Sequence, residues 1–169
     1  MKRPRSLPLF RSTEPDVFLF DTSAWLSIDF LPNRDEVWAT VRRLIESGRL
    51  FTCQQVVTEL RDDPIYETRI KPFEKALLAG DRSNDMEHLM AVGRITHDFP
   101  AMSKARGAKT PADQYVVALA KEEGYVVVAD ETTNKRKNRK IPGVCEQLKI
   151  RCITLKEFVA QAKREDSSA

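Results

Sequence analysis

A single segment organises this chain: Val17-Phe18-Leu19-Phe20-Asp21-Thr22-Ser23. Its first four residues are apolar without a break, which is typical of a strand buried on both faces of a parallel sheet. The apolar run ends in an aspartate. Ligands of open α/β sheets bind at the carboxyl ends of the strands, so Asp21 is a candidate site residue on a rigid support. An aspartate followed by two hydroxyl residues is also typical of a helix N-cap, and this segment alone leaves both interpretations open.

A second apolar strand, at 125–129, ends in the same way. Its sequence is Tyr-Val-Val-Val-Ala, and two acids, Asp130 and Glu131, follow it. The helix expected before it begins at Thr110-Pro111-Ala112-Asp113, where threonine is a typical N-cap, proline a typical first residue and an acid a typical third residue. Asp113 therefore has a purely structural explanation, since a carboxylate complements the positive end of a helix dipole. A helix that leads into a buried strand is half of a βαβ unit.

Shorter elements fill the rest of the chain. Brief strands are expected at 50–53 and 150–153. Apolar residues at helical spacing predict five further helical segments. These segments cover 35–48, 56–60, most of 65–107, 141–148 and 155 to about 162. Asp35 is the expected N-cap of the first segment and Gly48 its stop, and Met86 and Met90 are expected to pack in the core.

Glu59 lies on the rim of one of these helices. It comes three residues after Val56, beside the apolar face of the helix rather than opposite it. Its carboxylate would therefore lie at the boundary between the core and the solvent. The alternative is an exposed helix glutamate with no special role, and the surrounding sequence leaves that alternative open.

Length and composition describe an ordinary globular protein. The chain has 169 residues, of which 41% are hydrophobic and 31% charged, and this is enough for one domain with a real core. No apolar run approaches the roughly 20 residues of a membrane span, and no long apolar run follows the basic N-terminus as in a secretory signal. We therefore expect a cytoplasmic protein with no membrane partner.

Three cysteines, Cys53, Cys145 and Cys152, have no metal-ligand spacing, and the chain has only two histidines. A zinc site is therefore not expected. Free buried thiols in a reducing cytoplasm are the expectation instead.

The chain is expected to form one domain over residues 16–162. Residues 1–15 carry basic residues and prolines without periodicity, and we expect a loosely ordered arm. Residues 163–169 are polar and are expected to fray. No internal repeat and no linker-like change of composition divides the chain.

A basic block follows the second acid-ended strand. Five positive charges stand within six residues, at Lys135, Arg136, Lys137, Arg139 and Lys140. Such a block is commonly a solvated loop, and it is also suited to contact the phosphate backbone of a nucleic acid. The net charge of the whole chain, +3, is too small to argue nucleic-acid binding by itself.

The acids at strand ends and helix starts are more informative together than singly, because their convergence would create a strong concentration of negative charge. The candidates are Asp21, Glu59, Asp113, Asp130 and Glu131. Two carboxylates about 5 Å apart repel by roughly 3 kcal/mol at an effective dielectric of about 20. If the candidates converge, the cluster must take up protons or bind cations. Hard divalent ions, Mg²⁺ or Mn²⁺, suit an all-carboxylate site, where they orient a water, lower its pKa and stabilise charge on a phosphodiester.

Taken together, these motifs resemble those of the PIN-domain nucleases. The matching segments, in order, are Phe18-Leu19-Phe20-Asp21-Thr22-Ser23-Ala24-Trp25, Val56-Val57-Thr58-Glu59-Leu60, Thr110-Pro111-Ala112-Asp113 and Val126-Val127-Val128-Ala129-Asp130-Glu131. Each motif is weak alone, whereas their order and spacing match across nearly the whole chain. The segments 140–146 and 151–158 are similar to a poorly characterised bacterial branch of that family, which resembles the toxins of toxin–antitoxin pairs.

The resemblance implies an α/β fold, a three-layer α/β/α sandwich with a mostly parallel central sheet, and Mg²⁺-dependent cleavage of RNA. Carried over motif by motif, Asp21 is the central metal ligand, Glu59 the second acid and Asp113 the third. Thr22 or Ser23 is expected to steady Asp21 or a metal-bound water.

The fourth acid of the family stands two residues after a threonine at the strand end. Here Ala129 replaces that threonine, and Glu131 occupies the position of the acid. Asp130 is its immediate neighbour, and strand alternation would send the two side chains to opposite sides. We favour Glu131 as the fourth ligand, with Asp130 as the alternative.

The implied activity is that of an endoribonuclease in which a metal-bound water attacks phosphorus and no side chain acts as nucleophile. Mg²⁺ or Mn²⁺ is the implied cofactor, RNA the substrate, and the basic block would grip the RNA backbone beside the cut. The toxin resemblance further implies a cognate antitoxin that covers the acidic pocket, and a homodimer would be typical of the family.

Two other interpretations compete with this one. A catalytically weak PIN-like module that binds RNA or a protein would keep the fold and lose turnover, and the replacement at Ala129 leaves that alternative open. A phosphotransferase of the haloacid dehalogenase type also uses an aspartate after the first strand. It needs a second acid at the position where Ser23 stands, so the sequence disfavours it.

Overall fold

The computed structural model describes residues 14–102, 112–130 and 140–168. Within these residues, the centre of the fold is a four-stranded parallel sheet with the strand order β2-β1-β3-β4. The strands are β1 Phe18–Phe20, β2 Leu50–Phe51, β3 Val126–Val128 and β4 Cys152–Ile153. Phe18 pairs with Leu50 on one side and with Val126 on the other. The two long apolar runs are therefore neighbours at the centre of the sheet, and their carboxyl ends meet at the same edge.

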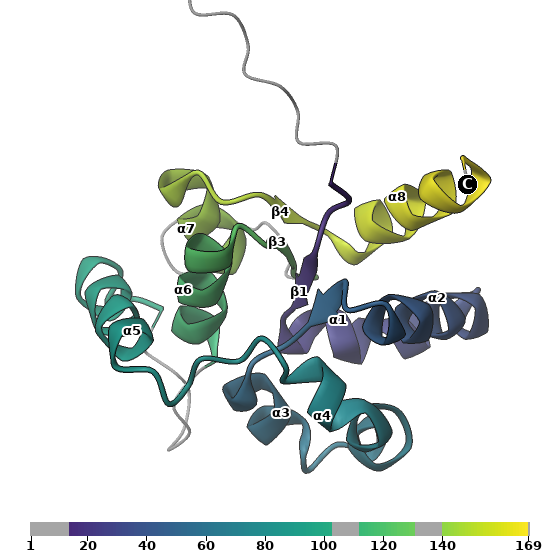
Figure 1. The fold of residues 1–169 in the computed structure, drawn as a ribbon, viewed down its shortest axis with the longest axis horizontal. Helices are drawn as coiled ribbons and strands as arrows, with labels where there is room; N and C mark the ends of the chain where they lie inside the picture. The colour runs from purple at the N-terminus through teal and green to yellow at the C-terminus, as the bar shows by residue number, and fades with distance from the viewer. Residues whose placement is uncertain (1–13, 103–111, 131–139, 169) are drawn as a thin grey trace, which may run out of the picture.

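Helices cover both faces of this sheet. They are α1 Thr22–Ser27, α2 Arg34–Glu46, α3 Gln54–Leu60, α4 Glu74–Leu77, α5 Met86–Asp98, α6 Asp113–Glu123, α7 Ile141–Leu148 and α8 Leu155–Ser167. Two 3-10 turns, Ile28–Phe30 and Lys71–Phe73, and a π-helical turn, Tyr66–Ile70, connect some of them. Figure 1 shows α2 and α8 on one side of the strands and α6 and α7 on the other. The predicted three-layer α/β/α sandwich with a parallel sheet is confirmed.

Side chains of β1 fill both layers of the core. The rings of Phe18 and Phe20 lie 5.0 and 4.9 Å from the ring of Phe158 in α8. Leu19 points to the opposite face, where α6 packs against β1. All three β1 side chains are fully buried, which explains why this strand is apolar at every position rather than at alternate positions.

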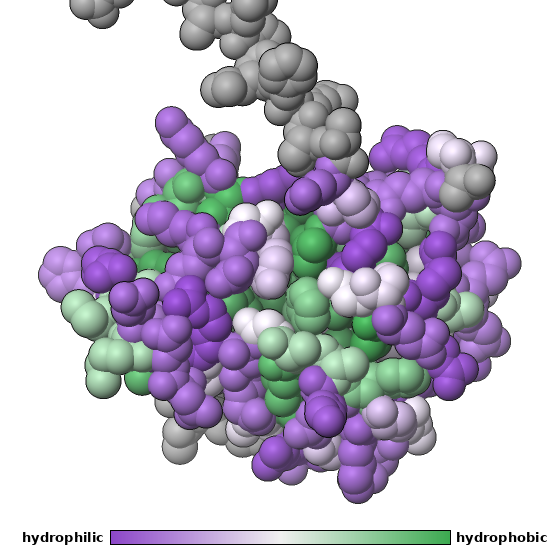
Figure 2. Space-filling view, viewed as in Figure 1, coloured by the Kyte–Doolittle hydropathy of each residue, from purple (hydrophilic) through white to green (hydrophobic). Residues whose placement is uncertain are grey.

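The outer surface follows the usual division of side chains. Figure 2 shows hydrophilic residues over most of the outer helices, apolar residues at the centre of this face, over the strands, and a further apolar patch at the left edge, over α5. Among the described residues, no helix combines the length and the apolar character that crossing a bilayer requires.

Two helix starts differ from prediction. The N-cap of α2 is Asn33, and Asp35 lies in the first helical turn instead of capping it. The N-cap of α6 is Ala112, which makes Asp113 the first residue of the helix rather than the third, while Thr110 and Pro111 lie outside the described residues. Aspartate is favourable both as an N-cap and within the first turn, so its presence near a helix start does not fix the boundary.

The end of the last helix is also different. α8 continues to Ser167 instead of ending near Ala162, so most of the segment expected to fray is helical. Arg43 of α2 is ion-paired with Asp166, and Arg49 is ion-paired with Glu165 at 2.8 Å. These contacts hold the last turns of α8 against α2 and against the residues between α2 and β2. The expected arm at 1–15 lies almost wholly outside the described residues, and the single domain at 16–162 stays a prediction.

The prediction that Met86 and Met90 of α5 pack in the core is wrong. Met86 and Met90 are 69% and 57% exposed, whereas His88, Val92 and Ile95 are buried. The helix carries apolar residues on two faces, and only packing against α6 decides which of them is covered.

Candidate active site

Asp21 joins the central strand to the first helix, as a residue after a strand and as a helix N-cap, while its role in a functional site stays a prediction. Its backbone N–H donates to the carbonyl oxygen of Val128 at 3.0 Å, so it extends the pairing of β1 with β3. It is also the N-cap of α1, and its Oδ2 accepts hydrogen bonds from the Ser23 N–H at 3.3 Å and the Ser23 hydroxyl at 2.8 Å. Asp21 is 3% exposed. A carboxylate this deeply buried is costly unless it is hydrogen-bonded, so its position is set by these contacts.

Ser23 links the acid after β1 to the end of β3. Its hydroxyl donates to Asp21 and accepts a hydrogen bond from the backbone N–H of Asp130 at 3.0 Å. Ala129, at the position of the family's threonine, has no hydroxyl to contribute, and in this chain Ser23 supplies a hydroxyl at the same strand end. The Asp130 side chain is exposed, and Glu131 lies outside the described residues. The choice between these two acids as the fourth ligand stays a prediction.

Glu59 connects three helices. One of its carboxylate oxygens, Oε2, accepts a hydrogen bond from the Thr22 hydroxyl, at the start of α1. The other, Oε1, accepts from the backbone N–H of Ala112 at 3.0 Å, directly before α6. Both oxygens of a residue on α3 are thus engaged by the starts of two other helices. Glu59 is therefore not an exposed helix glutamate, and its place in a functional site stays a prediction.

These contacts form one connected set. Thr22 and Ser23 are consecutive, and they bond to Glu59 on one side and to Asp21 and the Asp130 backbone on the other. Asp113 follows Ala112 and is half-buried at the start of α6, which packs against β1 and β3. The structure therefore brings the described acidic candidates to the carboxyl edge of the sheet.

The donor set has the chemistry of a hard-cation site. Asp21 and Asp113 offer carboxylate oxygens only, the donors that Mg²⁺ and Mn²⁺ prefer. Within 14–102, 112–130 and 140–168, no three Asp, Glu, His or Cys side chains come close enough together to hold a metal ion. Since Glu131 lies outside these ranges, the predicted metal ligands stay a prediction.

Two buried thiols lie near Asp21. Burial raises the pKa of the Cys53 thiol to about 12, and the charges of Asp81 and Asp21 add to that shift. A hydrogen bond with Cys152, followed by burial, raises the pKa of Cys145, with a further contribution from the charge of Asp21. Both thiols stay protonated at neutral pH and add no negative charge next to the acids. All three cysteines are free, as predicted.

Sequence reasoning missed two polar residues of this region. Thr52, fully buried after β2, donates its hydroxyl to the carbonyl oxygen of Phe20 at 2.8 Å and so fixes the backbone just before Asp21. A polar residue directly after an apolar strand was the available signal. Gln114 is buried next to Asp113, and among the described residues its Oε1 has no hydrogen-bond partner. The pattern around Gln114 gave no signal, because a polar residue in a first helical turn is usually exposed.

The basic block is mostly outside the described residues. Lys140 is described, as the exposed N-cap of α7, whereas Lys135, Arg136, Lys137 and Arg139 are not. Its role in binding RNA stays a prediction.

Comparisons with known proteins agree on the architecture. A family model described as a domain of unknown function, DUF4411, matches residues 18–165, and no curated protein sequence matches the chain. The fold is similar to that of FitAB bound to an IR36 DNA fragment, with a TM-score of 0.52 and 16% identity over 82% of this chain and 95% of that chain. It is also similar to DNA-bound VapBC from Salmonella typhimurium, with a TM-score of 0.50 and 20% identity over 83% of this chain and 99% of that chain. At these identities the likeness shows the fold, and it confirms the predicted PIN-like architecture.

Proposed function

We propose that this chain, which belongs to the DUF4411 family and has a PIN-like fold, is a metal-dependent endoribonuclease. One observation carries the proposal. Consecutive hydroxyl residues at the end of the central strand hold a buried Asp21 and a doubly bonded Glu59 at the carboxyl edge of the sheet. Acids gathered at one edge of the sheet repel one another, and this repulsion opposes folding. Cations bound by the acids would offset the repulsion and stabilise charge on a phosphodiester.

Each residue of the proposed site has a separate task. Asp21 and Asp113, with Glu131 or Asp130, would hold Mg²⁺ or Mn²⁺, which when bound lowers the pKa of water and stabilises charge on phosphate. Ser23 holds the Asp21 carboxylate in one orientation. Glu59 keeps the starts of α1 and α6 together, and therefore positions Asp21 relative to Asp113. No side chain is needed as a nucleophile.

The proposal includes the biological setting that the family resemblance implied. RNA would be the substrate, with the basic block from Lys135 to Lys140 on its backbone, and the cytoplasm the site of action. A toxin role, with a cognate antitoxin as partner and a homodimer as the assembly, is supported by the fold shared with the FitAB and VapBC structures.

Cleavage of a mixed RNA pool by the purified chain tests the proposal. We expect cleavage with Mg²⁺ or Mn²⁺, none with a chelator, and loss of at least about a hundredfold in rate for Asp21→Asn, which removes the central charge. Asp98→Asn, an exposed acid at the end of α5, is the matched control and should cleave like the parent chain. Cleavage that survives Asp21→Asn would refute the proposed site.

A binding module is the second candidate function. Two observations favour it: no three-residue metal set is found within the described residues, and Ala129 stands where the family has a threonine. RNA binding without any metal-dependent turnover, in a chain that folds normally, would establish this candidate in place of the nuclease.

A further inference from the structure

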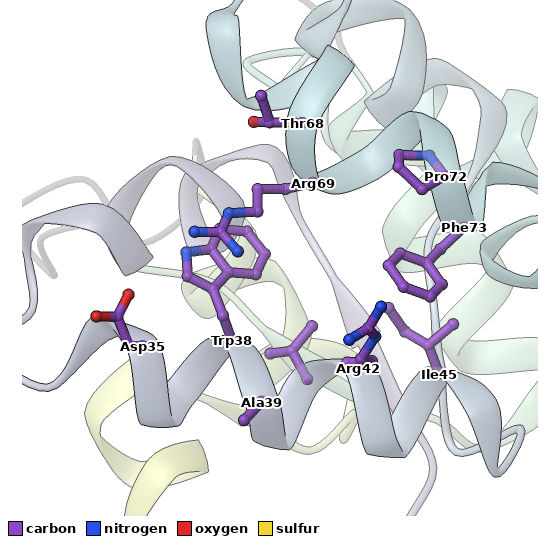
Figure 3. A pocket seen from close by; sticks show the side chains of 10 residues that line it. Asp35, Trp38, Ala39, Arg42, Ile45, Thr68, Arg69, Pro72 and Phe73 are labelled. Carbon is purple, nitrogen blue, oxygen red and sulfur yellow. The ribbon is translucent and has the colours of Figure 1, made fainter.

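A cleft beside α2, lined by none of the acids of the candidate active site, has no role in the proposed chemistry. It lies between α2 and the segment 68–73 and encloses about 340 Å³, within the range of small-molecule sites (Figure 3). Its charged and aromatic lining comes from both walls: Asp35, Trp38 and Arg42 from α2, and Thr68, Arg69 and Phe73 from the opposite segment.

Two arginines cross the cleft in opposite directions. The guanidinium of Arg69 lies 5.1 Å from the centre of the Trp38 ring, and that of Arg42 lies 5.4 Å from the centre of the Phe73 ring. Each wall therefore supplies one cation and one ring, as Figure 3 shows. Cation–π contacts at such distances favour one placement of each flexible side chain.

The floor beneath Arg69 is rigid. Trp38 is 7% exposed, its ring stacks on Trp25 at 6.1 Å, and its Nε1–H donates to Asp29 at 2.8 Å. Arg69 is thus held over a fixed aromatic plane.

The two positive charges are weakly compensated. Among the described residues, Arg69 makes no ion pair, and Arg42 has a contact of 3.5 Å with Glu46 in which both side chains are well exposed. Exposed pairs of this kind contribute little free energy. Asp35 is the only acid among the described residues that line the cleft. The cleft therefore suits an anion that also has a flat face.

We propose that this cleft binds a nucleotide, with its phosphate on the guanidinium groups of Arg42 and Arg69 and its base stacked on one of the planes that these side chains present. Guanidinium groups bind phosphate through paired N–H donors, and their planes are established stacking surfaces for bases. An acidic peptide would satisfy the charges and leave the flat faces unused. The ligand is either a free nucleotide or one nucleotide of an RNA strand, and the latter rests on the proposed function.

Calorimetric titration of the full chain with AMP, and separately with a single-stranded RNA tetranucleotide, tests the proposal in the presence of chelator, so that no strand is cut. We expect both to bind. Arg69→Gln should weaken binding about tenfold, the effect of one charge-assisted hydrogen bond. Ala39→Phe, which adds a bulky ring at a residue of the lining and keeps both charges, should weaken binding at least about tenfold by obstruction. Arg164→Gln, an exposed arginine of α8 with no ion pair among the described residues, is the matched control and should change nothing.

The outcomes separate the sources of the ligand. Equal affinity for AMP and the tetranucleotide supports a free nucleotide, and tighter binding of the tetranucleotide with the same sensitivity to Arg69→Gln and Ala39→Phe supports an RNA strand. Absence of binding at millimolar concentration overturns the proposal, as does binding that neither variant changes. Binding of a glutamate-rich peptide that AMP does not displace would overturn it in favour of a protein partner. AMP affinity should be the same in Asp21→Asn, so a failed nuclease assay and a failed cleft assay are distinguishable.

Discussion

Thr22 and Ser23 both carry one hydroxyl group, and they serve different acids. Successive residues at a helix start point about 100° apart, so the Thr22 hydroxyl reaches Glu59 while the Ser23 hydroxyl reaches Asp21. Both carboxylate oxygens of Glu59 are hydrogen-bonded, since Oε1 accepts from the Ala112 N–H. Its role in the proposed site is to position other residues, which makes its effect on folding stability measurable without substrate.

Glu59→Ala should lower the free energy of unfolding by about 2–3 kcal/mol, because it removes two hydrogen bonds to a charged acceptor and leaves the Ala112 N–H without its partner. Glu59→Gln should cost only about 1 kcal/mol, since its amide oxygen still accepts from Ala112 and its NH₂ group can donate to Thr22. Urea unfolding followed by tryptophan fluorescence measures both.

Glu67→Ala is the control for Glu59, because Glu67 is an exposed glutamate paired with Lys71 and should change stability by less than about 0.5 kcal/mol. If Glu59→Ala unfolds at the same urea concentration as this control, the linking role of Glu59 is refuted.

Cys53 makes stability depend on pH in the alkaline range. Its folded-state pKa, about 12, lies above that of an exposed thiol, so its contribution is complete below about pH 9 and is lost as the pH rises toward 12. Between pH 8 and pH 10 the parent chain should therefore lose about 1.4 kcal/mol more than Cys53→Ala, which has no thiol to ionise. Chemical unfolding of both chains at the two pH values measures the difference, and parallel losses would contradict the prediction.

At the scale of elements, two glycines show how the same substitution acts in opposite directions. Gly124 ends α6 with a φ of +72°, in the left-handed region that favours glycine. Gly93 lies inside α5, where nothing lies within 4 Å of the position that a Cβ would occupy. One glycine is required by its backbone conformation, and the other weakens its helix.

Gly93→Ala should raise the free energy of unfolding by about 0.5–1 kcal/mol, because alanine restricts the unfolded chain and fits the helix. Gly124→Ala should lower it by about 1 kcal/mol, because alanine is strained at positive φ. Thermal unfolding of the two variants beside the parent chain should give melting temperatures on opposite sides of the parent's. Two shifts of the same sign would contradict this account of the helix ends.

The elements also show which parts of the fold the sequence could reveal. β1 and β3 were predicted correctly because a strand buried on both faces is apolar at every position. The start of α2 was misplaced because an aspartate at 35 suits an N-cap and a first turn equally well. The exposure of Met86 and Met90 was missed because they were counted in the same apolar stripe as Val92 and Ile95, and only contact with α6 decides which of these residues are covered.

Across the whole molecule, the same limit applies to the candidate site. Sequence order could place Asp21 and Asp130 at strand ends, because parallel strands bring their carboxyl ends to one edge. The partners of Glu59 could not be predicted, since Thr22 and Ala112 lie far from it in the chain and bond to it only after three helices pack. Thr52 and the Arg42–Arg69 cleft depend on packing in the same way.

The contact between α8 and α2 yields a prediction at this scale. A chain that ends at Ala162 loses the ion pairs of Arg43 with Asp166 and of Arg49 with Glu165, together with the last turns of α8. It should be less stable than the full chain by about 1 kcal/mol, the usual range for partly exposed pairs. A chain that ends at Ser167 keeps both pairs and serves as the control. Equal urea midpoints for the two truncated chains would show that 163–167 is dispensable.

The pairing of Phe18 with Val126 has a consequence for synthesis. During translation β1 leaves the ribosome before β3, and among its two neighbours in the sheet only β2 can join it until β3 has been made. Until then the Asp21 N–H lacks the Val128 carbonyl, and the Ser23 hydroxyl lacks the backbone of Asp130. A growing chain therefore lacks two hydrogen bonds of the segment 21–23 until β3 has been made, and activity that depends on that arrangement is expected only after that point. If the chain cuts RNA as proposed, this order of events would delay cleavage until β3 has joined β1.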